Sequence, residues 1–288
     1  MKTIRIETVD GIGLAADIAG DPAAPCVVLM HGGGQTRASW SRAGEELVAA
    51  GYRIVNFDAR GHGESDWAGP GGYDLGRSAA DLACVIEGIE GSYALVGASL
   101  GGVTALRAMA EGMQPDAVVL VDIVPNPHPA GVARIRAFMQ ARPEGYDTLD
   151  EVADAIAAYN PHRPRPRDTG GLMRNLRLNK AGRYVWHWDP AFLGREIDDE
   201  LTELTATIEG ARRAHDVPTL LIRGTSSDVV SDEGIAILRD VLSALEVHDV
   251  AGAGHMVAGD RNDAFNAGLI AFLRRHFPAL RAPDQNSP

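Results

Sequence analysis

The sequence predicts an α/β fold with a mostly parallel central sheet flanked by helices. Short apolar runs recur along the chain, and helix-length amphipathic segments separate them. The runs are rich in Val, Ile and Leu and cover Cys26–Met30, Arg53–Phe57, Tyr93–Val96, Ala117–Val121, Pro218–Ile222 and Glu246–Val250. Runs of this kind are typical of strands buried on both faces of a parallel sheet. A chain of 288 residues, 45% of them hydrophobic, suits one large domain or a core with an inserted subdomain.

An antiparallel hairpin is expected ahead of these strands. Thr3–Val9 and Gly13–Ile18 alternate apolar and polar residues on either side of the turn residues Asp10 and Gly11. The first ten residues lack the long apolar core of a signal peptide, and no later apolar run approaches the length of a membrane span. We therefore expect a cytoplasmic protein that does not bind a membrane.

The pattern changes in the middle of the chain, where amphipathic helices interrupted by prolines replace the buried-strand runs. We interpret residues 126–215 as a helical cap inserted into an α/β core that comprises residues 1–125 and 216–280. A single long surface excursion is the alternative interpretation of this stretch. The polar, proline-containing residues 281–288 are expected to form a disordered tail.

The charge balance narrows the choice of ligand. Asp and Glu outnumber Lys and Arg by 39 to 27, and the net charge of −12 predicts no basic patch for nucleic acid or an anionic membrane. A small neutral molecule is the expected partner, and the oligomeric state stays open, a homodimer included. Cys26 and Cys84 are expected to be free thiols without a catalytic role. No cluster has metal-site spacing, so neither a metal nor a cofactor is expected.

The strongest chemical motif is the segment 97–102, Gly-Ala-Ser-Leu-Gly-Gly, which directly follows one apolar run and precedes a helical segment. A sharp turn from strand to helix holds the central serine in a strained backbone conformation. Small residues two positions before and after that serine prevent collisions with the flanking chain. The motif therefore predicts a nucleophile elbow with Ser99 as the nucleophile.

A serine hydroxyl is a poor nucleophile unless a neighbouring base takes its proton. Of nine histidines, His255 is the best placed, because it lies in a glycine-rich loop after the last apolar run. Its imidazole needs an orienting carboxylate, and Asp228 is expected to supply it from the loop after the run 218–222. Asp122, which directly follows the run 117–121, is the rival, because this fold can also take its acid from that position.

Backbone N–H groups that stabilise an oxyanion are expected from two places. The tight loop after the run 26–30 offers Gly33 and Gly34, and the residue after the nucleophile offers Leu100. His31, which opens the loop, is interpreted as a structural residue that hydrogen-bonds within it. The segment 58–65 is interpreted as a hydrogen-bonded turn that braces the strand end beside this loop.

Two tryptophans of the expected cap, Trp186 and Trp188, are candidates for substrate binding. Aromatic side chains supply apolar area to a pocket, and the segment that contains them also carries a histidine and an aspartate. Packing of the cap on the core is the alternative role of these tryptophans. The two roles differ in whether substrate preference or overall stability depends on them.

Taken together, the segments 31–34, 58–65 and 97–102, with Asp228 and His255, resemble the α/β-hydrolase superfamily. The resemblance covers the chain from the first strand to the last helix, and it is closest to capped bacterial esterases, epoxide-hydrolase-like proteins and cofactor-free haloperoxidases. It implies a serine hydrolase that cleaves a small carboxylic ester, lactone or thioester through an acyl-enzyme. Epoxide hydrolases and haloalkane dehalogenases carry aspartate at the elbow, so the serine at position 99 disfavours both.

Other activities are compatible with the same residues. Carbon–carbon bond hydrolases of ring-cleavage products share the serine triad, although Gln35-Thr36-Arg37 stands here where those enzymes usually have Gly-Pro-Gly. Perhydrolase activity, in which peroxide replaces water in the attack on the acyl-enzyme, needs no further residue. A receptor for a small signal molecule is the alternative of another class. Turnover of a short-chain ester that Ser99→Ala abolishes distinguishes an enzyme from a receptor.

Overall fold

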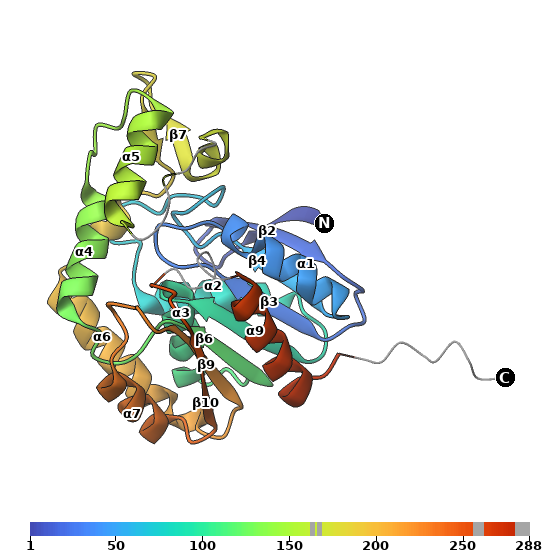
Figure 1. The fold of residues 1–288 in the computed structure, drawn as a ribbon. Helices are drawn as coiled ribbons and strands as arrows, with labels where there is room; N and C mark the ends of the chain where they lie inside the picture. Colours follow the sequence, from blue (N-terminus) through green and yellow to red (C-terminus); the bar gives the residue numbers. More distant parts are fainter. Residues whose placement is uncertain (162–164, 166–168, 256–261, 280–288) are drawn as a thin grey trace.

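The computed structural model describes residues 1–161, 165, 169–255 and 262–279. Its centre is an eight-stranded sheet with the strand order β1-β2-β4-β3-β5-β6-β9-β10 (Figure 1). The six strands from β4 to β10 in this order pair in parallel, whereas β1 and β2 form an antiparallel hairpin that joins the edge of β4. The strands span Lys2–Glu7 (β1), Gly13–Ala19 (β2), Cys26–Met30 (β3), Arg53–Phe57 (β4), Tyr93–Ala98 (β5), Ala117–Val121 (β6), Thr219–Gly224 (β9) and Leu245–Val250 (β10). The predicted α/β class and the predicted hairpin are confirmed.

The central strands match the apolar runs of the sequence closely. β3, β4 and β6 begin and end at the predicted residues, and every residue of β3 and β6 is buried. β5 continues past its apolar run through Gly97 and Ala98, and β9 continues through Arg223 and Gly224, which the apolar pattern does not mark as strand. The edge strand β1 instead alternates exposed and half-buried residues, because one of its faces is open to solvent.

Two layers of helices cover the sheet. One face packs against α1 and α9 through an apolar cluster that includes Trp40, Leu47, Phe265 and Phe272. The other face packs against α2, α3, α6 and α7 through a second apolar cluster. These helices span Ser41–Ala49 (α1), Leu75–Glu87 (α2), Leu100–Ala110 (α3), Ile197–Gly210 (α6), Asp232–Val241 (α7) and Asn262–His276 (α9). The buried sheet is therefore a rigid support for the loops at the carboxyl ends of its strands.

The segment 126–215, called the cap segment below, contains helices and one small sheet. The sheet pairs β7 with β8 antiparallel and was not predicted, because strands of three residues are too short to produce a periodic pattern. The elements that precede α6 are α4 (Pro129–Gln140), α5 (Leu149–Tyr159), η2 (Gly170–Asn175), β7 (Leu176–Leu178), β8 (Tyr184–Trp186) and η3 (Pro190–Leu193). Figure 1 shows α4 and α5 standing beside the core, away from the C-terminal helix α9.

The end of the cap segment packs as part of the core. Leu204 and Ile208 of α6, with Ala211 and Ala214 of the short helix η4 (Ala211–Ala214), belong to the same apolar cluster as α2 and α3. The division into core and cap at residues 126 and 215 thus stays a prediction. The predicted tail at 281–288 lies outside the described residues. None of the helices in the described ranges is long and apolar enough to cross a membrane.

Candidate active site

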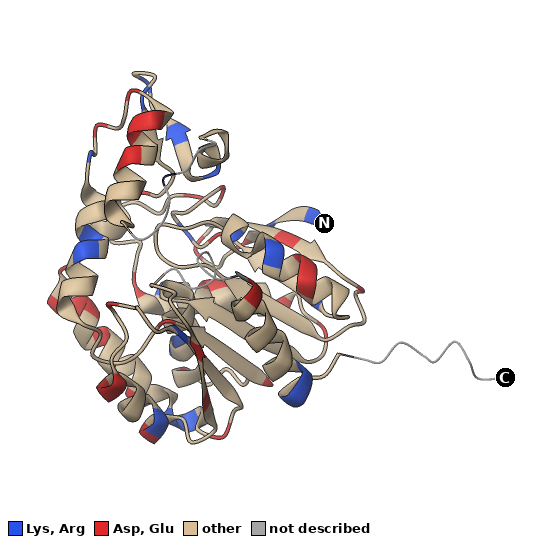
Figure 2. Ribbon diagram, viewed as in Figure 1, with Lys and Arg blue, Asp and Glu red and all other residues tan. Residues whose placement is uncertain are grey.

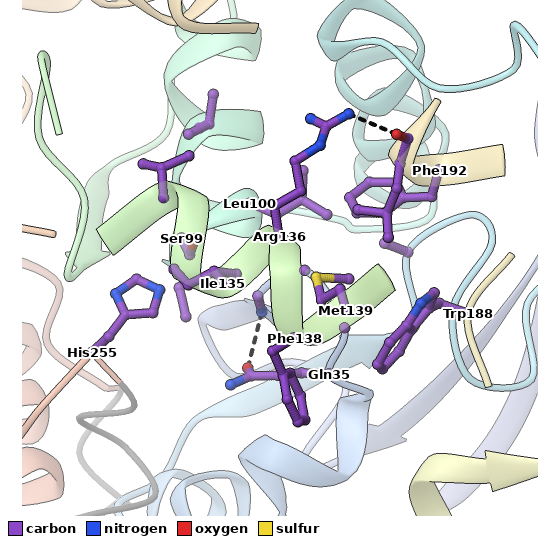
Figure 3. Close-up of a pocket in the computed structure, with 18 of the residues that line it drawn as sticks. Gln35, Ser99, Leu100, Ile135, Arg136, Phe138, Met139, Trp188, Phe192 and His255 are labelled. Carbon is purple, nitrogen blue, oxygen red and sulfur yellow. Dashed lines mark hydrogen bonds between the residues drawn. The ribbon is translucent and has the colours of Figure 1, made fainter. Parts of the chain in front are cut away.

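A cavity of about 750 Å³ lies where the carboxyl ends of the central strands meet the cap segment. Ser99, Leu100 and His255 line it from the core (Figure 3). Most of the remaining wall is apolar or aromatic and includes Val103, Ile123, Val132, Ile135, Phe138, Met139, Ile156, Leu172, Trp186, Trp188, Phe192, Leu201 and Leu204. The size and the lining are typical of a site for a small, largely apolar molecule.

Ser99 occupies the sharp turn between β5 and α3. Its backbone angles, φ 44° and ψ −109°, lie in a region that residues other than glycine rarely adopt. A Cβ atom at Gly97 would lie 2.3 Å from the carbonyl carbon of Gly101, and one at Gly101 would lie 2.4 Å from the carbonyl oxygen of Met30. Glycine is therefore required on both sides of the serine. The strand, turn and helix predicted around Ser99 are present.

His255 lies next to Ser99 on the cavity wall (Figure 3). Its Nδ1 is 2.7 Å from Oδ2 of Asp122, a carboxylate that is 1% exposed and directly follows β6. The same carboxylate accepts hydrogen bonds from the hydroxyl of Ser227 at 2.6 Å and from the N–H of Gly224 at 3.2 Å. These bonds fix the carboxylate in one orientation toward the imidazole.

The prediction that Asp228 orients His255 is wrong. Asp228 forms an ion pair with Arg134 of α4 at 2.7 Å, and its side chain is 38% exposed. The loop after β9 is turned so that the neighbouring residue, Ser227, faces Asp122 instead. The rival carboxylate Asp122 therefore occupies the position beside the imidazole. Ser227 was not singled out from the sequence, because a hydroxyl in a serine-rich loop carries no distinctive pattern.

The arrangement of these groups suits proton transfer from a hydroxyl. When Nδ1 of a neutral imidazole donates its hydrogen to a carboxylate, the lone pair of Nε2 remains available as an acceptor. Asp122 can also stabilise the imidazolium that forms when Nε2 takes a proton. His255 can thus act as a base toward Ser99, with Asp122 holding the required tautomer.

The loop after β3 supplies one backbone donor to the cavity, and α3 supplies another. Among the residues that the structure describes, the N–H groups of Gly33 and Leu100 have no hydrogen-bond partner, and both residues line the cavity. The N–H of Gly34 instead donates to Nε2 of His62 at 3.1 Å. The prediction that Gly34 is an oxyanion donor is therefore wrong, because its only N–H is already bound. Gly33 and Leu100 remain as the candidate pair.

The structural role predicted for His31 is confirmed. Its Nδ1 donates to the carbonyl oxygen of Gly32 at 2.8 Å, and its Nε2 accepts the N–H of Ala59 at 3.0 Å. The segment 58–65 forms the predicted turn: Asp58 accepts the N–H of Glu64 at 2.9 Å, and the hydroxyl of Ser65 donates to the Asp58 carbonyl at 2.6 Å. The imidazole of His31 thus ties this turn to the loop at residues 32–35, which is called the oxyanion loop below.

The two tryptophans of the cap segment both line the cavity. Their rings stack on each other with centroids 5.0 Å apart and an interplanar angle of 9°. Phe138 of α4 packs against Trp186 with a centroid distance of 5.3 Å. Trp188 also approaches Gly34, because a Cβ atom at Gly34 would lie 3.4 Å from the Trp188 ring. One aromatic wall therefore faces the space above the oxyanion loop.

Two arginines on the cavity wall are each paired with a glutamate that also lines it. Arg136 donates to Glu200 at 3.1 Å and to the carbonyl oxygen of Leu193 at 2.7 Å, the second bond being drawn in Figure 3. Arg195 forms an ion pair with Glu203. Burial raises the pKa of Glu200.

On the outside of the molecule, Figure 2 shows basic residues interspersed with acidic ones in that view.

Comparisons with known proteins show which family the chain belongs to. A sequence profile described as the alpha/beta hydrolase family matches residues 27–267. Esterase Rv0045c of Mycobacterium tuberculosis is 33% identical over 267 residues, which cover 87% of this chain and 82% of that protein. Epoxide hydrolase A of the same organism is 27% identical over 313 residues, covering 94% and 97%. The solved structure of E-2-(acetamidomethylene)succinate hydrolase, 22% identical, has a TM-score of 0.81 and covers 94% and 98% of the two chains. The chain belongs to the α/β hydrolase family.

Proposed function

We propose that the protein is a serine esterase that cleaves a small neutral carboxylic ester, or a related lactone or thioester, through an acyl-enzyme. In this proposal Ser99 is the nucleophile, His255 is the general base and Asp122 is the orienting acid. The observation that carries it is the 2.7 Å hydrogen bond between His255 and a buried Asp122, on the wall of the cavity that also contains the strained serine.

The first half of the reaction forms the acyl-enzyme. Oγ of Ser99 attacks the carbonyl carbon of the ester while Nε2 of His255 takes the hydroxyl proton. The negative charge that develops on the carbonyl oxygen accepts hydrogen bonds from the N–H groups of Gly33 and Leu100. When the tetrahedral intermediate collapses, the bond to the alcohol oxygen breaks and the imidazolium returns its proton to the departing alcohol.

The second half regenerates the enzyme. Water replaces the alcohol in the cavity, and His255 takes a proton from it as the water oxygen attacks the acyl carbon. The same two N–H groups stabilise the second oxyanion. Collapse releases the carboxylic acid, and Ser99 recovers its proton from the imidazolium. No residue beyond the triad and the two amides is required for either half.

The relatives and the elbow residue together favour an esterase over an epoxide hydrolase. Esterase Rv0045c has the higher identity of the two relatives above. An epoxide hydrolase of this fold opens its substrate with an elbow aspartate, which forms an alkyl ester with the protein, whereas the elbow here carries Ser99. A serine alkoxide leads instead to an acyl-enzyme, which is the intermediate of ester hydrolysis.

The walls of the cavity favour a neutral substrate with an apolar part. Arg136 and Arg195 are each neutralised by a glutamate, so neither guanidinium is set aside for a carboxylate on the substrate. Trp186 and Trp188, stacked on the wall, are proposed to contact the acyl or alcohol group. Such contacts exclude water and orient the ester above the oxyanion loop.

The proposal is tested with a series of p-nitrophenyl esters and a fluorophosphonate probe. Ester turnover should be well above background, Ser99→Ala should abolish it, and mass spectrometry should find one stoichiometric adduct on Ser99. An adduct at another residue, or turnover that survives Ser99→Ala, would refute the assignment. A folded protein that binds these esters without turning them over would favour a receptor instead.

A further inference from the structure

Three buried histidines surround the oxyanion loop at residues 32–35. They come from separate parts of the chain: His31 directly follows β3, His62 lies in the turn after β4, and His187 lies in the cap segment. The ring centroids of His31 and His62 are 5.2 Å apart, and those of His62 and His187 are 5.8 Å apart. Each residue is at most 2% exposed. None of the three takes part in the proposed triad.

Each histidine binds a different peptide group of the oxyanion loop. His31 donates from Nδ1 to the carbonyl of Gly32, and His62 accepts the N–H of Gly34. Nε2 of His187 lies 3.3 Å from the carbonyl oxygen of Gly34. The peptides 32–33, 33–34 and 34–35 are therefore each held from one side by an imidazole. A planar trans peptide directs its C=O and N–H in opposite directions, so the Gly32 carbonyl fixes the direction of the Gly33 N–H, and the Gly34 carbonyl fixes that of the Gln35 N–H. The Gln35 N–H donates to the Gly32 carbonyl at 3.0 Å, so His187 acts on the Gly33 N–H through this hydrogen bond.

The second nitrogen of the His187 ring determines its tautomer. Nδ1 accepts the N–H of Gly63 at 2.8 Å, so the ring proton of the neutral imidazole is on Nε2 and is donated to the Gly34 carbonyl. Burial lowers the pKa of His187 to about 4 and also lowers the pKa values of His31 and His62. His187 is thus neutral near pH 7 and makes one donor and one acceptor bond.

The neighbours of His187 in the sequence connect this histidine to the aromatic wall of the cavity. The two tryptophans on either side of His187 stack on each other and line the cavity. The alternate residues bind the core instead: Asp189 accepts the hydroxyl of Tyr73 at 2.7 Å and the N–H of Gly69 at 3.0 Å. The stretch that forms the aromatic wall therefore also holds the oxyanion loop.

We propose that His187 is a positioning residue for the oxyanion hole. Through the Gly34 carbonyl, and the hydrogen bond from Gln35 to Gly32, it holds the loop so that the N–H of Gly33 is aimed at the developing oxyanion. This inference rests on the proposed esterase function, and it makes the rate of the chemical step depend on a residue of the cap segment. Displacing the cap segment then lowers kcat as well as changing which substrates fit.

Two substitutions separate the two hydrogen bonds of the ring. His187→Asn keeps a carbonyl oxygen near the position of Nδ1, which can still accept from Gly63, but it loses the donor to Gly34. His187→Gln is longer and brings an amide N–H near the position of Nε2, so it keeps that donor. Asp189→Asn is the matched control, because it weakens hydrogen bonds between the same cap stretch and the core without contacting the oxyanion loop.

The measurements are kcat and KM for a short p-nitrophenyl ester, the melting temperature, and the affinities of two inhibitors. A trifluoromethyl ketone forms a tetrahedral adduct with an oxyanion, whereas the corresponding secondary alcohol does not. For His187→Asn we expect kcat and the affinity of the ketone to fall about 10- to 100-fold, with KM and the affinity of the alcohol within about twofold of wild type. His187→Gln should recover most of kcat, and Asp189→Asn should lower the melting temperature but retain kcat.

Three results would overturn the inference. The first is a His187→Asn variant with wild-type kcat and ketone affinity, and the second is an Asp189→Asn variant that loses kcat to the same extent. The third is failure of both His187 variants to unfold cooperatively, which would assign this histidine to stability alone. Turnover that survives Ser99→Ala would instead refute the esterase proposal itself, so the two failures are distinguishable.

Discussion

Nδ1 of His255 lies 2.7 Å from Oδ2 of Asp122, although the two residues are 133 positions apart in the chain. The strand order explains how they meet near Ser99. β5, β6, β9 and β10 are successive neighbours in the sheet, and the serine, the aspartate and the histidine follow β5, β6 and β10 respectively. Asp122 is thus one strand away from the nucleophile, whereas the loop that carries Asp228 is two strands away.

The two aspartates should differ sharply when each is changed to asparagine. Asp122→Asn leaves Ser99 and His255 in place but removes the charge that holds the imidazole, and kcat should fall by about 10⁴-fold, as in serine proteases. Asp228→Asn weakens only a half-exposed ion pair with Arg134 and should change kcat by less than about threefold. Steady-state kinetics on both variants, with circular dichroism to check folding, provides the test. The opposite ranking would return the acid to Asp228.

Ser227 should contribute to the rate through the carboxylate. Its hydroxyl donates to Oδ2 of Asp122, so Ser227→Ala leaves that oxygen with one hydrogen bond fewer and less firmly oriented. A lost bond to a buried charged group corresponds to about 1.5–3 kcal/mol, and we expect kcat to fall roughly 10- to 100-fold with little change in KM. Ser226→Ala is the matched control, since it alters the adjacent exposed serine. Equal kinetics for the two variants would exclude this role.

Truncation of Trp186 or Trp188 to Ala should change substrate preference. Loss of one buried aromatic contact should lower kcat/KM for the preferred ester by about 1–3 kcal/mol, roughly 10- to 200-fold, relative to a small ester. Labelling of Ser99 by a small fluorophosphonate should persist. The check is kcat/KM for a short and a long ester beside the melting temperature. Parallel loss for both esters with a lower melting temperature would mean that the tryptophans only pack the cap segment.

Stability should decrease as the pH falls from about 6.5 toward 4. The pKa of His187 is lowered from 6.5 to about 4 by burial, aided by His31 and Arg177 and opposed by the hydrogen bond to Gly34 and by Asp58. Between these values the unfolded chain binds the proton and the folded chain does not. The free energy of unfolding therefore has its full value above the unfolded pKa and decreases as the pH falls toward the folded pKa. At 1.36 kcal/mol per unit, this amounts to about 3 kcal/mol for the fully buried ring.

Urea unfolding between pH 4.5 and 7 measures this effect, and His187→Gln should flatten the slope. Burial lowers the pKa values of His31 and His62 as well, so part of the slope should remain in that variant. Burial raises the pKa values of Asp81 and Glu200, so these carboxyl groups bind protons more readily in the folded chain. Their contribution to stability therefore increases as the pH falls, opposite to that of the histidines. A slope identical to that of the wild type would show that folding does not lower the pKa of His187.

Local patterns predicted the strands and the elbow well, because both depend on neighbouring residues. Ser99 follows a buried strand and is flanked by glycines that the turn requires. The acid could not be chosen in this way, since Asp122 and Asp228 both follow a strand and only the course of the β9 loop decides between them. The prediction of Gly34 as an oxyanion donor failed for a similar reason, because the partners of its backbone groups lie far away along the chain. Its N–H is bound by His62, and its carbonyl by a residue 153 positions away.

The backbone of Ser99 has a consequence for how the protein tolerates change. A non-glycine residue held at φ 44° costs about 1–3 kcal/mol of folding free energy, which glycine would largely avoid. Ser99→Gly should therefore yield an inactive protein that is more stable than the wild type. Selection for thermal stability alone would favour loss of the nucleophile, so any directed evolution of this scaffold must select for turnover at the same time.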